Sequence, residues 1–72
     1  MEFVCVKFPS ARTVYIDRAP GGSTNETLQV NRGVHRFDLG EPRDYAPSFR
    51  RRHVKDTTPI RPMEVCFEQE QA

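Results

Sequence analysis

The sequence predicts an all-β domain, a small antiparallel β-sandwich of about six to seven short strands. Three features lead to this prediction. Apolar and polar residues alternate with a period of two, β-branched and aromatic residues gather in short runs, and Gly or Pro separates the runs. No segment combines a helical period with helix end signals. The 72 residues suffice for one hydrophobic core, so residues 1–72 are predicted to form a single domain.

Each predicted strand rests on its own local pattern. Alternation is clearest where His35, Phe37 and Leu39 share one face, and residues 18–23, with Pro20 followed by two glycines, are predicted to be a turn. Residues 68–72 are polar and are predicted to be frayed. The predicted strands are residues 2–8, 13–17, 27–30, 34–39, 48–54 and 63–67.

Residues 48–54 break the simple alternation, because Arg51 shares its parity with Phe49 and His53. A strand with one buried face keeps Arg51 in solvent only if it contains a bulge or lies at a sheet edge. The preceding residues 42–47 are predicted to interrupt the strands, with Tyr45 packing back over the edge of the core.

The charge of the chain is nearly balanced, with 11 Lys and Arg against 10 Asp and Glu. A net charge of +1 gives no overall attraction to nucleic acid or anionic membranes. No apolar run is long enough to span a bilayer. The first residues do not resemble a secretory signal, so the chain as it stands is predicted to be cytoplasmic. If it is a fragment of a longer protein, an envelope or exported location is the alternative.

A domain of this size is only marginally stable. The free energy gained by burying apolar surface and the free energy lost by ordering the chain are both about 110 kcal/mol and nearly cancel. We therefore expect support from a disulfide, a partner subunit or neighbouring domains. Cys5 and Cys66 lie near opposite ends of the chain in alternating stretches. Two buried free thiols and a disulfide between first and last strand both remain open; the disulfide would contribute about 4 kcal/mol.

The order of several short motifs resembles the PEGA domain. The resemblance implies a small β-sandwich that serves as an accessory module of bacterial envelope or surface proteins, with a structural or binding role and no catalytic residues. The chain departs from the family pattern at Ala11, Arg12, Arg18, Asn25 and Asp44. The motifs that carry the resemblance are residues 9–17 (PSARTVYID), 22–24 (GST), 28–30 (LQV), 33–39 (GVHRFDL) and Tyr45.

Motifs of known chemistry are missing from the sequence, so no enzyme activity and no cofactor are predicted. Cys5, His35, His53 and Cys66 match the number of ligands of a zinc site but lack the close pairs that such modules use. His35 is predicted to pack its ring and to bond a turn carbonyl, and Asp17 to accept backbone N–H groups at a turn.

A basic cluster is the candidate binding surface. Guanidinium groups beside aromatic rings can contact phosphates and stacked bases, whereas positive charges on an edge strand can also merely prevent aggregation. The main prediction is therefore a non-enzymatic structural or protein-interaction module with an unknown protein partner or a second copy of itself. The alternative is binding of single-stranded nucleic acid or another polyanion. The cluster comprises Arg43, Tyr45, Arg50, Arg51, Arg52, His53 and Lys55.

Overall fold

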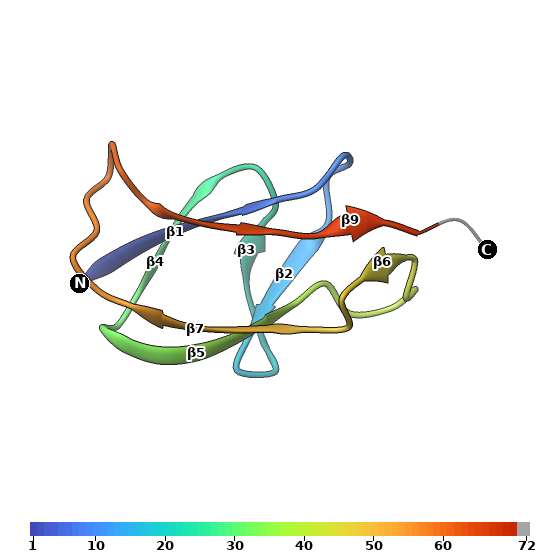
Figure 1. Ribbon diagram of the computed structural model, residues 1–72, viewed down its shortest axis with the longest axis horizontal. Helices are drawn as coiled ribbons and strands as arrows, with labels where there is room; N and C mark the ends of the chain where they lie inside the picture. Colours follow the sequence, from blue (N-terminus) through green and yellow to red (C-terminus); the bar gives the residue numbers. More distant parts are fainter. Residues whose placement is uncertain (71–72) are drawn as a thin grey trace.

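The computed structural model confirms the all-β prediction and describes residues 1–70 (Figure 1). This part of the chain contains no helix, and so none that could cross a membrane. Its nine strands are β1 (Glu2–Lys7), β2 (Thr13–Ile16), β3 (Ala19–Ser23), β4 (Thr27–Val30), β5 (Gly33–Asp38), β6 (Tyr45–Ala46), β7 (Arg50–Val54), β8 (Met63–Cys66) and β9 (Glu68–Gln69).

Three sheets account for these strands, in the orders β4-β1-β8, β3-β2-β5-β7 and β6-β9. In Figure 1, β1 runs above β5 and β7, and the β6-β9 ribbon lies at the end of the molecule opposite the N-terminus. All pairs are antiparallel except β1 and β8, which run in parallel. This pair differs from the expected antiparallel arrangement, because the loop after β7 crosses to the other sheet before β8 begins.

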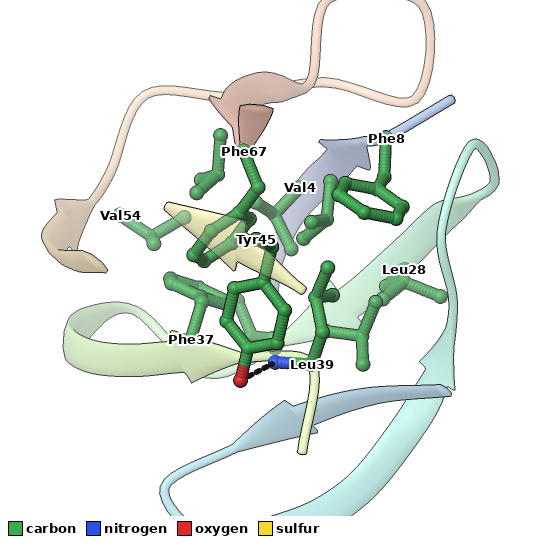
Figure 2. Close-up of a cluster of buried hydrophobic side chains, with 12 residues drawn as sticks. Val4, Phe8, Leu28, Phe37, Leu39, Tyr45, Val54 and Phe67 are labelled. Carbon is green, nitrogen blue, oxygen red and sulfur yellow. Dashed lines mark hydrogen bonds between the residues drawn. The ribbon is translucent and has the colours of Figure 1, made fainter. Parts of the chain in front are cut away.

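The core forms where the inner faces of the two larger sheets meet (Figure 2). Period-two alternation places Val14, Leu28, Val30, Phe37 and Val65 on that inner face, as predicted. Ile16 and Met63 pack against its margin. The buried cluster comprises Val4, Val6, Phe8, Val14, Leu28, Val30, Phe37, Leu39, Tyr45, Val54, Val65 and Phe67.

The predicted turn at residues 18–23 is wrong, because Ala19–Ser23 forms strand β3. The chain instead reverses at Asp17 and Arg18, whose φ angles are 53° and 70°. Two positive φ angles define a type I′ hairpin turn, which matches the twist of the flanking strands and favours Gly in the second position. Arg18 in that position costs about 1 kcal/mol relative to glycine.

Strand β3 tolerates its unusual composition because it lies at the edge of its sheet. Pro20 lacks an N–H group and suits an edge position. The register passes from Val14 opposite Gly22 to Tyr15 opposite Pro20, so Gly21 is the extra residue of a bulge. The Pro-Gly-Gly sequence therefore marks an irregular edge strand, not a turn.

The expectation that residues 68–72 are frayed is also wrong for the described part. Glu68 and Gln69 form β9 and pair with β6, and the N–H of Glu70 donates to the carbonyl oxygen of Asp44 at 2.7 Å. This ladder ties the end of the chain to the loop after β5. Residues 71–72 lie outside the described residues.

The two cysteines are free thiols. Cys5 is buried, as the prediction of two buried thiols expects, whereas Cys66 is exposed and differs from that prediction. Their strands are neighbours, but Cys5 lies opposite Glu64 and Cys66 opposite Lys7. An offset of two residues on adjacent strands separates the Cα atoms by about 8 Å, which is beyond disulfide reach. The described residues therefore contain no disulfide, and the backbone ladder joins β1 to β8.

The Arg12 side chain makes polar contacts with several segments of the fold. It is only 14% exposed. Its guanidinium group forms an ion pair with Asp44 and donates to the carbonyl oxygens of Leu39 at 3.2 Å and Pro42 at 2.8 Å. It also lies over the rings of Phe8 and Tyr45, 5.7 and 5.6 Å from their centroids. A largely buried charge is tolerated only with such partners.

Replacing Arg12 with Ala should lower the free energy of unfolding by about 2–3 kcal/mol, because the part-buried carbonyl of Leu39 and the carboxylate of Asp44 lose their partner. Urea unfolding followed by circular dichroism measures the change. Arg61→Ala is the matched control, since Arg61 is exposed and its side chain forms no ion pair among residues 1–70. Equal stability of the two variants would contradict the structural role of Arg12.

Candidate functional site

Strand β7 carries the predicted basic cluster and lies at the edge of its sheet, next to β5. The edge position, without a bulge in its pairing with β5, keeps Arg51 out of the core, in agreement with one of the two predicted solutions. Arg51 and His53 are exposed, whereas Arg50 and Arg52 share the inner parity of the fully buried Val54.

Two arginines of the cluster bond backbone groups. The Nε of Arg50 donates to the carbonyl oxygen of Cys66 at 3.0 Å, which links β7 to the end of β8. A terminal nitrogen of Arg52 donates to the carbonyl oxygen of Arg51, also at 3.0 Å. Only the Arg50 bond joins two strands. Arg51, His53 and Lys55 are the basic residues of this segment that are exposed.

Tyr45 belongs to the core and not to an exposed binding surface, which corrects the prediction for this residue. Its side chain is 5% exposed and meets Phe8 and Phe67 edge to face. Its hydroxyl accepts from the N–H of Leu39 at 3.3 Å, drawn in Figure 2, and donates to the carbonyl oxygen of Gly40 at 2.9 Å. Tyr45 therefore fixes the end of β5, and its ring cannot stack on a nucleic-acid base.

Tyr45→Phe should reduce the free energy of unfolding by about 1–2 kcal/mol, because the backbone groups of Leu39 and Gly40 each lose a partner. Thermal unfolding checks the loss. The core packing of the ring is unchanged in this variant. A variant as stable as the wild-type protein would show that water replaces the hydroxyl at no cost.

A like-charged pair occupies the outer face of the four-stranded sheet. Arg36 of β5 lies directly opposite Arg51 of β7. Like charges at this position destabilise a sheet. No carboxylate within residues 1–70 comes within 4.0 Å of either guanidinium. Arg36 instead lies over the ring of Phe49, 4.7 Å from its centroid, and Phe49 and Val34 are 44% and 59% exposed.

Arg36 was not among the predicted site residues, because it appeared as one polar residue on the outward face of an alternating strand. The alternation of residues 34–39 already placed the Arg36 side chain on the solvent-facing side of the strand. Its position beside Arg51 depends on the register between β5 and β7, which the sequence does not reveal. We call Val34, Arg36, Phe49, Arg51 and His53 the outer-face patch.

A recess of about 330 Å³ adjoins this patch, with Arg36 common to both. Arg18 of the hairpin turn and Arg43 of the loop after β5 also line it, so three arginines come from three separate segments. Arg43 therefore lies in a different part of the surface from Arg51. Its Nε is 3.8 Å from an oxygen of Glu41, and both side chains are largely exposed. Such a contact contributes little.

Asp17 and His35 hold the hairpin turn that carries Arg18. As predicted, one Asp17 oxygen accepts the N–H of Arg36, at 3.0 Å. The other lies 2.7 Å from Nδ1 of His35, whose Nε2 is 2.6 Å from the carbonyl oxygen of Asn31, the predicted turn carbonyl. Both ring nitrogens of His35 face acceptors, so only the protonated imidazolium satisfies both contacts.

These contacts change the pKa values of both groups. Burial lowers the pKa of His35, but its hydrogen bonds to Asp17 and Asn31 and the charge of Asp17 outweigh burial, so the pKa is raised. The hydrogen bond from the N–H of Arg36, followed by the contact with His35, lowers the pKa of Asp17. The pair is thus stabilised in its charged form.

The stability of the protein should depend on pH through His35. Its raised pKa means that the stabilisation is complete below the unfolded value of about 6.5 and is lost as the pH rises through the folded value. The Asp17 contribution, with a lowered pKa, is lost only as the pH falls through the folded value of that carboxyl. Melting temperatures between neutral and alkaline pH should fall for the wild-type protein and stay flatter for His35→Gln. Parallel profiles would contradict this linkage.

No group of three or more metal-ligating side chains occurs within residues 1–70. His35 already bonds through both ring nitrogens, and His53 lies on the outer face of β7. The described residues therefore offer an arginine-rich surface and no arrangement of donors suited to zinc.

No family model matches this chain, and no curated protein and no solved structure matches it significantly. The PEGA resemblance therefore stays a prediction. What the structure defines is the class: a small all-β domain with an arginine-rich outer face on one sheet.

Proposed function

We propose that this protein is a non-enzymatic protein-interaction module that binds an acidic segment of a partner through the outer-face patch. The observation that carries the proposal is the Arg36–Arg51 pair on neighbouring strands. Two like charges face each other without a carboxylate partner in the described part of the chain, at a cost to the fold. Violations of such rules concentrate at functional sites.

The patch has the composition of a protein-binding surface. Exposed Val34 and Phe49 flank the two arginines, and aromatic residues and arginines are the side chains most enriched at the centres of protein interfaces. A segment that combines carboxylates with apolar side chains complements both features. A second copy would bring the same positive charges together, so self-association through this face is disfavoured.

Nucleic acid fits this surface less well. Single-strand binding uses successive exposed aromatic rings as stacking platforms. Tyr45 is buried, and Arg36 already lies over the ring of Phe49. Arg50 and Arg52 are half-buried and each donates one N–H group to a backbone carbonyl, so they present less of the guanidinium group to a phosphate than the exposed Arg51 does. The accessory-module role that the PEGA resemblance implies agrees with a protein partner.

A direct comparison of probes tests the proposal. A labelled peptide alternating Glu and Leu should bind in fluorescence anisotropy, and Arg51→Glu should weaken binding about tenfold or more, since a favourable charge contact becomes repulsive. Arg61→Glu, with the same charge change outside the patch, should bind like the wild-type protein.

A single-stranded oligonucleotide of matched length is the competing probe. Tighter binding of the oligonucleotide, with a steep dependence on salt, would establish nucleic-acid binding in place of protein binding. Equal loss in the Arg51 and Arg61 variants would indicate attraction by overall charge and would overturn the patch as the site.

A further inference from the structure

We infer that the recess beside the outer-face patch binds a single carboxylate, supplied by an acidic side chain of the partner segment. This inference rests on the proposed function and specifies its central contact. Arg18, Arg36 and Arg43 line the recess from three different segments, with Tyr15 and Ser48 adding hydroxyl groups. Guanidinium groups recognise carboxylates in paired, planar geometry.

The arginines of the recess are only weakly neutralised. Arg43 has a long contact with Glu41, whereas neither Arg18 nor Arg36 has a carboxylate within 4.0 Å in the described residues. Asp38 also lines the recess, but one of its oxygens accepts the N–H of Gly40 at 3.0 Å. Arg18 and Arg36 therefore form no ion pair within the described residues and can each pair with a carboxylate of a ligand.

The charge balance selects the kind of anion. Three arginines against Asp38 and Glu41 leave the recess with a charge of +1. A carboxylate, with one negative charge, matches this balance. A phosphate monoester carries close to two negative charges at neutral pH and would leave an excess beside the two resident carboxylates.

Arg18 occupies its place against local preference. Its φ angle of 70° is in the left-handed region, at the turn position that favours glycine. Asp17 holds the turn in this conformation through the N–H of Arg36 and the ring of His35. The fold thus accepts backbone strain at the residue whose side chain lines the recess, and strain of this kind concentrates at binding sites.

Several contacts within the chain hold the backbone beside the recess. Tyr45 is one of its lining residues, and the Tyr45 hydroxyl bonds the backbone of Leu39 and Gly40. Gly40 has a φ of 68°, and a Cβ atom there would lie 2.6 Å from a ring carbon of Tyr15, so only glycine lets that ring form the wall. Arg12 fixes the same loop from the core side. A preformed site loses little entropy on binding.

Nuclear magnetic resonance titration with an oligoglutamate peptide tests the inference, with oligoglutamine of equal length as the uncharged control. Oligoglutamate should shift the Gly40 amide and the side-chain Nε–H signals of Arg18, Arg36 and Arg43. Oligoglutamine should leave them unchanged. Shifts confined to Arg51 and His53 would place the contact on the patch alone and overturn the inference.

Arg18→Gly is the decisive variant, because glycine is the preferred residue at this turn position. Its melting temperature should equal or exceed that of the wild-type protein, while its affinity for oligoglutamate falls about tenfold. Arg61→Ala removes the same charge away from the recess and should leave affinity unchanged. Loss of affinity in a variant that is at least as stable as the wild-type protein cannot arise from unfolding.

The outcomes separate this inference from the proposed function. If Arg51→Ala weakens oligoglutamate binding and Arg18→Gly does not, the recess inference fails and the patch remains the binding surface. If oligoglutamate produces no shift at low salt, both fail. Tighter binding of a phosphoserine peptide than of oligoglutamate, through the same signals, would overturn the assignment of a single carboxylate.

Discussion

The guanidinium group of Arg12 joins parts of the chain that no strand ladder connects. It leaves water almost completely and is compensated by Asp44 and by the carbonyl oxygens of Leu39 and Pro42. Because a charge that is largely removed from water requires such partners, these contacts stabilise the position of the loop after β5. The same loop forms part of the recess and leads into β6, so the arrangement of the surface follows from a contact near the core.

The second constraint is the hairpin turn between β2 and β3. Asp17 uses both carboxylate oxygens, one for the N–H of Arg36 and one for His35. These bonds hold a type I′ turn that contains no glycine and present Arg18 beside Arg36. Since the bonds require a charged carboxylate and are best satisfied by an imidazolium, the charged form of the pair stabilises the turn that carries Arg18.

The positive residues of the chain fall into classes that composition cannot distinguish. Arg12 acts as a buried structural cation, and Arg50 bonds a strand end. Arg18, Arg36 and Arg51 have no carboxylate partner within residues 1–70. A nearly neutral chain can therefore present a locally positive surface. The proposed acidic partner follows from this separation, because charge complementarity requires only the local field.

The sequence by itself determined β1, β2, β4, β5, β7 and β8, but not β3, β6 or β9. It also determined the buried faces at residues 27–30, 34–39 and 63–67, since a period of two is a local property and is plain there. It missed the Asp17–Arg18 turn because arginine occupies the position where glycine is the usual signal. The packing of Tyr45 on the core was predicted, but tertiary structure alone decided that its hydroxyl bonds Leu39 and Gly40 and that Arg36 faces Arg51. These facts depend on strand register and on contacts between distant segments, which local residue patterns do not specify.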